Sequence, residues 1–209
     1  MPKKIVASAF GLLLSTIAAN AGPITTPPPT LSAVGDVTAV YVFANALDVS
    51  DLNEVTPKAI NQVFCNHTSG SCTGNNAGDT LDLGIQNGAM VFSLNDLTNG
   101  NHFTNTAADV DGNYHVLIST DFSVYNVGAL PSAAASVIAS LLSSGQTVTY
   151  VGWEDRTLAQ GSDFDYNDLI FAFANTTTTT REVPEPLTLS LFGAGLFGTA
   201  LLRRRRKTA

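Results

Sequence analysis

The chain contains 209 residues, of which 44% are hydrophobic, and it carries a net charge of −7 at neutral pH. Most of its cations lie at the two ends, and residues 22–182 hold three cations against 16 acidic side chains, a net charge of −13. Such an acidic surface repels nucleic acids, which excludes them as partners, and it favours divalent cations or neutral polysaccharides. About 160 residues are enough for one domain with its own core and too few for two.

The N-terminal residues have the composition of a secretory signal. Two lysines precede an apolar run at 5–18, and the small residues Ala19 and Ala21 occupy the positions that signal peptidase recognises. We predict a signal helix in residues 1–21 and cleavage after Ala21. Residues 22–30 then form a leader rich in threonine and proline, which the prolines keep extended.

The exported domain is predicted over residues 31–175. Its strand-like segments are rich in β-branched and aromatic residues and are bounded by Gly, Asn or Asp. The alternation of Leu81, Leu83 and Ile85 with polar neighbours indicates one buried face and one wet face. The predicted strands are 37–43, 59–64, 80–86, 89–94, 114–120, 147–153 and 169–174. Short strands with frequent turns predict an all-β fold, an antiparallel β-sandwich of jelly-roll-like form.

The only two cysteines, Cys65 and Cys72, are separated by six residues in a chain that we expect to be exported. Because the periplasm and the cell exterior are oxidising, we predict a Cys65–Cys72 disulfide that closes a small loop. A zinc site is disfavoured, since this pair and the nearby His67 supply too few ligands.

Asp111-Gly112 predicts a tight hairpin turn. Asp109, Asp111 and Asn113 also place oxygen atoms at alternate positions, as the start of a calcium-binding loop does. The turn is the favoured interpretation, because an EF-hand loop needs Gly at its sixth position and an acidic residue at its twelfth, where this chain has Tyr and Thr.

One short helix interrupts the strand pattern. Pro131 and Ser132 open a segment, 133–144, whose larger apolar residues follow helical spacing, and Gly145 ends it. We expect this helix to cover an end or a face of a sheet.

The densest group of carboxylates lies near the end of the domain, where Gly-Trp-Glu-Asp at 152–155 precedes Asp-Phe-Asp-Tyr-Asn-Asp at 163–168. An extended backbone would place the oxygens of the second motif on one side and its rings on the other. Crowded carboxylates repel one another unless a cation or backbone donors compensate, and calcium prefers such ligands. The predicted ligands are Asp163, Asp165, Asn167 and Asp168, with Glu154 and Asp155 as weaker candidates. An alternative of equal weight is that these side chains cap turns before the last strand.

These two motifs resemble the C-terminal signature of a bacterial extracellular domain of unknown function. The matching residues are Gly152, Trp153, Glu154, Asp155, Asp163, Asp165, Tyr166, Asn167 and Asp168. The resemblance implies a β-sandwich of the kind found in surface and adhesin-like proteins, with calcium as the suspected ion.

Catalysis is not the expected role of this acidic group. Glu154 and Asp155, with Asp163 or Asp165, could form the carboxylate pair of a glycan hydrolase, but nothing in the sequence fixes the required geometry. The three histidines lack a nucleophile motif and metal-type spacing. We therefore predict that the protein is not an enzyme.

The last residues form a tail of three parts. A threonine-rich linker is predicted at 176–182, and Val183-Pro184-Glu185-Pro186 then interrupts regular structure, because proline lacks an amide donor. The uncharged run 187–202 would make a transmembrane helix of roughly 24 Å, at about 1.5 Å per residue. The cations behind it, which stay on the cytoplasmic side, are Arg203, Arg204, Arg205, Arg206 and Lys207.

This tail, residues 183–209, resembles the PEP-CTERM protein-sorting signal of Gram-negative bacteria. The resemblance implies recognition and removal of the tail by a membrane-embedded exosortase, with delivery to the cell envelope or the extracellular surface. A simple C-terminal membrane anchor is the alternative.

The sequence therefore predicts an exported, non-catalytic structural or interaction protein associated with exopolysaccharide, which is the setting that the sorting signal implies. The expected processing partners are signal peptidase and an exosortase, and the tail holds the chain in the membrane before processing. The alternative is a calcium-assisted carbohydrate-binding or adhesion module in which Trp153 or Tyr166 stacks on a sugar. A glycan hydrolase that uses Glu154 is a second, weaker alternative.

Overall fold

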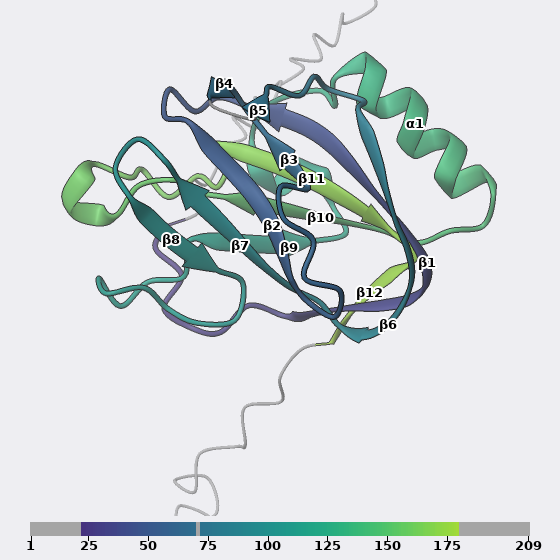
Figure 1. Ribbon diagram of the computed structural model, residues 1–209, viewed down its shortest axis with the longest axis horizontal. Coiled ribbons are helices and arrows are strands. Elements are labelled where there is room, and N and C mark those ends of the chain that lie inside the picture. Colours follow the sequence, from purple (N-terminus) through teal and green to yellow (C-terminus); the bar gives the residue numbers. More distant parts are fainter. Residues whose placement is uncertain (1–21, 70–71, 180–209) are drawn as a thin grey trace, which may run out of the picture. The chain divides into compact units, whose positions relative to one another are not determined.

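The computed structural model describes residues 22–69 and 72–179, which form two antiparallel sheets, a small hairpin and one α-helix (Figure 1). In the larger, six-stranded sheet, β1 pairs with β6, β11 and β12, and β10 lies between β11 and β9. The strands of this sheet are β1 (Thr30–Ala44), β6 (Thr80–Ala89), β9 (Val116–Ser119), β10 (Val148–Trp153), β11 (Leu169–Ala174) and β12 (Thr176–Thr179).

The second sheet has four strands in the order β3-β2-β7-β8. These strands are β2 (Ser50–Thr56), β3 (Phe64–Cys65), β7 (Val91–Asp96) and β8 (Asn101–Thr104). Its side chains pack on one face of the larger sheet, with the rings of Phe92 and Phe173 4.5 Å apart and those of Phe64 and Phe171 5.7 Å apart. The predicted all-β, antiparallel sandwich is confirmed at this level.

The opposite face of the larger sheet is covered as well. The helix α1 (Ser132–Ser143), at the upper right of Figure 1, buries Ala134 and Ile138 in a second apolar cluster with the 3-10 helix η1 (Phe122–Tyr125) and strand residues such as Ile170. All six residues of β10 and all six of β11 are therefore buried. Burial on both faces explains the continuous apolar sequence of β11. The predicted helix is confirmed within one residue at each end.

One predicted strand is wrong. Segment 59–64 contributes only Phe64 to a strand, because Ala59 and Gln62 have φ values of 56° and 59°. This segment is a loop in which the Gln62 N–H donates to Asn53 Oδ1 at 2.6 Å. The strands β2 and β8 were not predicted, and in β2 the inward positions include the polar Ser50 and Glu54, which hide the alternation.

The fold extends beyond the predicted domain at both ends. In the leader, Ile24 forms a β-bridge with Tyr114 and packs against the second apolar cluster. In the linker, Thr176–Thr179 form β12, which pairs with the first residues of β1, from Thr30↔Thr179 to Ala33↔Thr176. Threonine is β-branched and pairs readily with a strand that lacks a partner, so its polarity is not enough to exclude it from the sheet.

The loop with the cysteines contains the hairpin of β4 (Thr68–Ser69) and β5 (Cys72–Thr73). Cys65 is buried in β3, and it has no free thiol. The side chain of Cys72 lies outside the described residues, so its pairing with Cys65 stays a prediction.

The signal helix, the apolar run 187–202 and the cluster of arginines also lie outside the described residues. Within residues 22–69 and 72–179, no helix is both long and apolar enough to cross a membrane.

Candidate functional site

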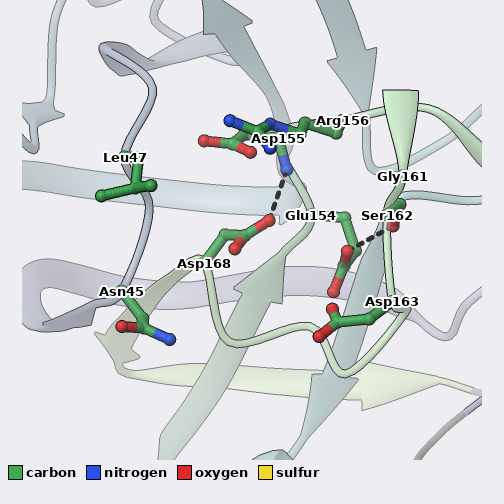
Figure 2. A pocket seen from close by; sticks show the side chains of 9 residues that line it. All are labelled: Asn45, Leu47, Glu154, Asp155, Arg156, Gly161, Ser162, Asp163 and Asp168. Carbon is green, nitrogen blue, oxygen red and sulfur yellow. Dashed lines mark hydrogen bonds between the residues drawn. The ribbon is translucent and has the colours of Figure 1, made fainter.

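The acidic motifs converge on a pocket of about 180 Å³ next to the ends of β10 and β11 (Figure 2). One wall is the segment that leaves β10, the second is the loop that enters β11, and the third is the connection from β1 to β2. The residues that line the pocket are Asn45, Leu47, Glu154, Asp155, Arg156, Gly161, Ser162, Asp163 and Asp168.

Glu154 is the most enclosed carboxyl group of the pocket, with none of its surface exposed. The Ser162 hydroxyl donates to one carboxylate oxygen, and the Tyr166 N–H donates to the other at 2.5 Å. Burial raises the pKa of Glu154 to about 7, and the negative charge of Asp168 adds to this effect. Glu154 therefore ties the loop that enters β11 to the end of β10.

Asp163 and Asp165 approach Glu154 from that loop. The three side chains each place one carboxylate oxygen within 4.8 Å of the others. Burial and the charge of Asp163 raise the pKa of Asp165, which shows how closely the negative groups crowd. Asn167 belongs to the same loop, where its side-chain amide and its N–H both donate to Asp165.

Asp155 and Asp168 form a second acidic pair. The Asp155 N–H donates to Asp168 Oδ2 at 3.0 Å, as Figure 2 shows. Asp155 is only 2% exposed, and its Oδ2 has no hydrogen-bond partner among the described residues. Burial raises the pKa of both carboxyl groups, and the charge of Asp168 raises that of Asp155 further.

The predicted segregation of oxygens and rings along an extended 163–167 segment is wrong. Phe164 and Tyr166 have φ values of 54° and 57°, so the loop is not extended there. Both rings are buried, and Trp153 is fully buried as well. None of these rings is available to stack on a sugar, which corrects the mode of carbohydrate binding that we predicted for Trp153 and Tyr166.

Arg156, its partner Asp48 and Ser162 contribute to the site and were not predicted. Arg156 lies on the pocket wall, and its Nε donates to Asp48 Oδ2 at 2.6 Å, which lowers the pKa of Asp48. Ser162 binds Glu154 directly. No sequence signal marks Asp48, because it lies far from the acidic motifs along the chain and meets Arg156 only through the fold.

A second group of metal-ligand type contains Asp109, Asp111 and His115. A tight turn is found here, since the Gly112 N–H donates to the Asp109 carbonyl at 2.9 Å and Gly112 has a φ of 80°. The predicted hairpin is wrong, because the flanking strands β8 and β9 belong to different sheets. Asn113 uses its N–H to bind Asp111 Oδ1 at 2.9 Å, as a turn residue does.

Comparison with known families identifies the C-terminal tail. Residues 182–206 match the PEP-CTERM protein-sorting motif. The chain carries this sorting motif. PEP-CTERM motifs are processed by exosortases, so the motif indicates an exported protein that an exosortase sorts to the cell envelope. No curated protein and no solved structure matches the chain.

Proposed function

We propose that the domain carried by the PEP-CTERM signal is a non-catalytic structural or interaction component of the cell envelope or extracellular matrix, associated with exopolysaccharide. The observation that carries this proposal is the state of Glu154, the most enclosed acidic group of the site. Its side chain has no exposed surface, and both of its oxygens accept hydrogen bonds from the loop that enters β11. Such a carboxylate holds a loop in place.

The same observation argues against the glycan hydrolase. A glycosidase places two carboxyl groups on either side of a sugar bond, where both must reach the substrate. Glu154 has no exposed surface to offer, although its raised pKa alone would suit a general acid. Only Asp163 of its acidic neighbours in the cluster is well exposed.

We propose as a second function that Glu154, Asp163 and Asp165 bind Ca²⁺. The observation that favours it is the approach of three carboxylate oxygens to within 4.8 Å of one another, from two segments of the chain. Calcium accepts six to eight oxygen ligands at about 2.3–2.6 Å, so water or the hydroxyl groups of a glycan would complete the shell. Because the neighbouring rings are buried, a glycan would be held through the ion and the polar wall.

Calcium titration of the exported protein tests the ion site. We expect Asp163→Asn combined with Asp165→Asn to abolish heat release on calcium addition, and to abolish the increase in melting temperature that calcium gives the wild type. Asp36→Asn combined with Asp82→Asn is the matched control, since it removes the same charge from two exposed positions on β1 and β6. Equal binding by both double variants would reject the site, and so would an absence of binding at millimolar calcium.

The matrix role is tested with exopolysaccharide from the producing cells. We expect the protein to sediment with the polysaccharide and to release no new reducing ends from it. If a chelator abolishes this sedimentation, the protein contacts the polysaccharide through the calcium site. Release of reducing ends that Glu154→Gln eliminates would overturn the non-catalytic proposal.

A further inference from the structure

The turn between β8 and β9 gathers a group of side chains that the acidic pocket does not use. The Asp109 N–H donates to the Asn113 carbonyl, and the Gly112 N–H donates to the Asp109 carbonyl, both at 2.9 Å. This tight turn brings the two aspartates back toward His115, which lies just before β9. Asp109, Asp111 and His115 each offer one ligand atom within 4.8 Å of the others.

His115 supports this arrangement from inside the protein. The residue is 1% exposed, and its ring stacks on Phe103 with centroids 4.2 Å apart and an interplanar angle of 26°. Its Nδ1 is buried and has no partner among the described residues. Packing therefore fixes the imidazole, and its Nε2 faces the Asp111 carboxylate.

The separation of the His115 and Asp111 ligand atoms matches that of two neighbouring ligands of one metal ion. His115 Nε2 lies 3.3 Å from Asp111 Oδ1 and 3.2 Å from Oδ2. Without a metal this contact is a hydrogen bond shared between both oxygens, and it is longer than the about 2.7–2.9 Å of a charge-assisted hydrogen bond. Bonds of about 2.0–2.2 Å to a tetrahedral or octahedral metal place neighbouring ligand atoms about 3.0–3.5 Å apart.

The Asp111 carboxylate is already oriented for such a role. The Asn113 N–H donates to its Oδ1 at 2.9 Å, and the Leu158 N–H donates to its Oδ2 at 3.1 Å. Asp109 supplies the second carboxylate. Both aspartates are half-buried, so water can complete the coordination shell.

We propose that Asp109, Asp111 and His115 bind a divalent transition metal of the zinc class. The imidazole nitrogen separates this site from the Glu154 group, which offers only oxygens and suits calcium. A metal-bound histidine usually donates its second N–H to an acceptor, whereas ring packing orients the imidazole here. The site is then open on its solvent side, with the two aspartates at the rim and the imidazole at the base.

Zinc titration of the exported protein in excess calcium tests the site, because calcium occupies the all-oxygen group. We expect Asp109→Asn and His115→Gln each to weaken zinc binding at least about tenfold. The matched controls are Asp36→Asn and His102→Gln, which alter an exposed aspartate and an exposed histidine elsewhere and should leave zinc binding unchanged.

Asp109→Asn keeps the test valid if the buried His115→Gln variant unfolds. In the wild type, zinc should also shift the imidazole nitrogen resonances of His115 in long-range ¹H–¹⁵N spectra and leave those of His102 in place. Equal zinc affinity of Asp109→Asn and Asp36→Asn would overturn the proposal. Unmoved His115 resonances at saturating zinc would do so as well.

Discussion

The atoms packed around Gly152 explain why the acidic motif near the end of β10 begins with a glycine. A Cβ atom on Gly152 would lie 2.3 Å from Tyr125 Cε1 and 2.3 Å from the Tyr166 carbonyl oxygen. The Tyr125 hydroxyl donates to the carbonyls of Leu117 and Tyr150 at 3.0 Å, so its ring cannot easily move aside. The missing side chain therefore lets the loop with Tyr166 close over β10.

We expect Gly152→Ala to lower the free energy of unfolding by about 3 kcal/mol, because the new methyl group overpacks a fixed ring and a backbone carbonyl. Gly88→Ala is the comparison, since a Cβ there meets open space and brings only the strain of its φ of +92°. That strain amounts to about 1 kcal/mol. Urea unfolding of both variants measures the difference, and equal losses would contradict the steric explanation.

Glu54 is a buried carboxyl group on the other side of the core. Its Oε2 accepts from Gln86 Nε2 at 3.1 Å, while its Oε1 and the Gln86 Oε1 have no partners among the described residues. Burial raises the pKa of Glu54 above its ordinary value of 4.5. Folding therefore favours the neutral form of Glu54 more than water does.

The folded state consequently binds more protons than the unfolded state between pH 4.5 and the raised pKa of Glu54. Stability must then fall as the pH rises through this window. We expect Glu54→Gln to remove part of this fall, because glutamine stays neutral and can donate to the Gln86 Oε1. Thermal unfolding from pH 4.5 to pH 8 measures the slope. Asp36→Asn, at an exposed position, should leave it unchanged, and an unaltered slope in Glu54→Gln would refute the assignment.

At the level of elements, β12 shows how a polar segment becomes part of a sheet. Thr176 is buried, and its Oγ1 donates to the Phe173 carbonyl at 2.8 Å. The Thr147 hydroxyl donates to the Thr176 carbonyl at 2.7 Å. The strand covers the part of β1 that contains Leu31 and Ala33, both of which are buried.

A chain that ends at Asn175 should be less stable than one that ends at Thr179 by about 2–4 kcal/mol, because several backbone hydrogen bonds of about 1 kcal/mol each are lost and the Leu31 edge is exposed. Urea unfolding of the two truncated chains gives the value. Equal stability would mean that β12 contributes nothing to the sheet.

The sequence predicts best the elements in which the buried positions are all apolar and follow one regular pattern. β11 is buried on both faces and is found at its predicted bounds, and α1 follows from its helical spacing and its flanking Pro and Gly. β2 escaped prediction because two of its inward residues, Ser50 and Glu54, are polar. Local periodicity cannot reveal a buried side chain whose partner, such as Gln86, lies on a distant strand.

The acidic site was predictable in composition and not in conformation. Glu154, Asp163 and Asp165 do converge, and a dense acidic motif was the signal for them. The left-handed backbone at Phe164 and Tyr166, which turns these rings into the core, leaves no pattern in the sequence. The group of Asp109, Asp111 and His115 was not predicted either. The sequence pattern pointed to a calcium loop with oxygen ligands only, and it gave no reason to add the nitrogen of His115.

At the level of the whole molecule, the first strand, β1, pairs with the last two, β11 and β12. β1 begins at Thr30, and its partners β11 and β12 lie between Leu169 and Thr179, at the other end of the domain. An exported chain emerges from the membrane with its N-terminus first. The edge of β1 that pairs with β11 and β12 therefore stays unpaired until nearly all of the domain has crossed the membrane. Pairing over such a sequence separation is slow. The apolar stretch around Val40 and Val42 is then open to aggregation while the rest of the chain is exported.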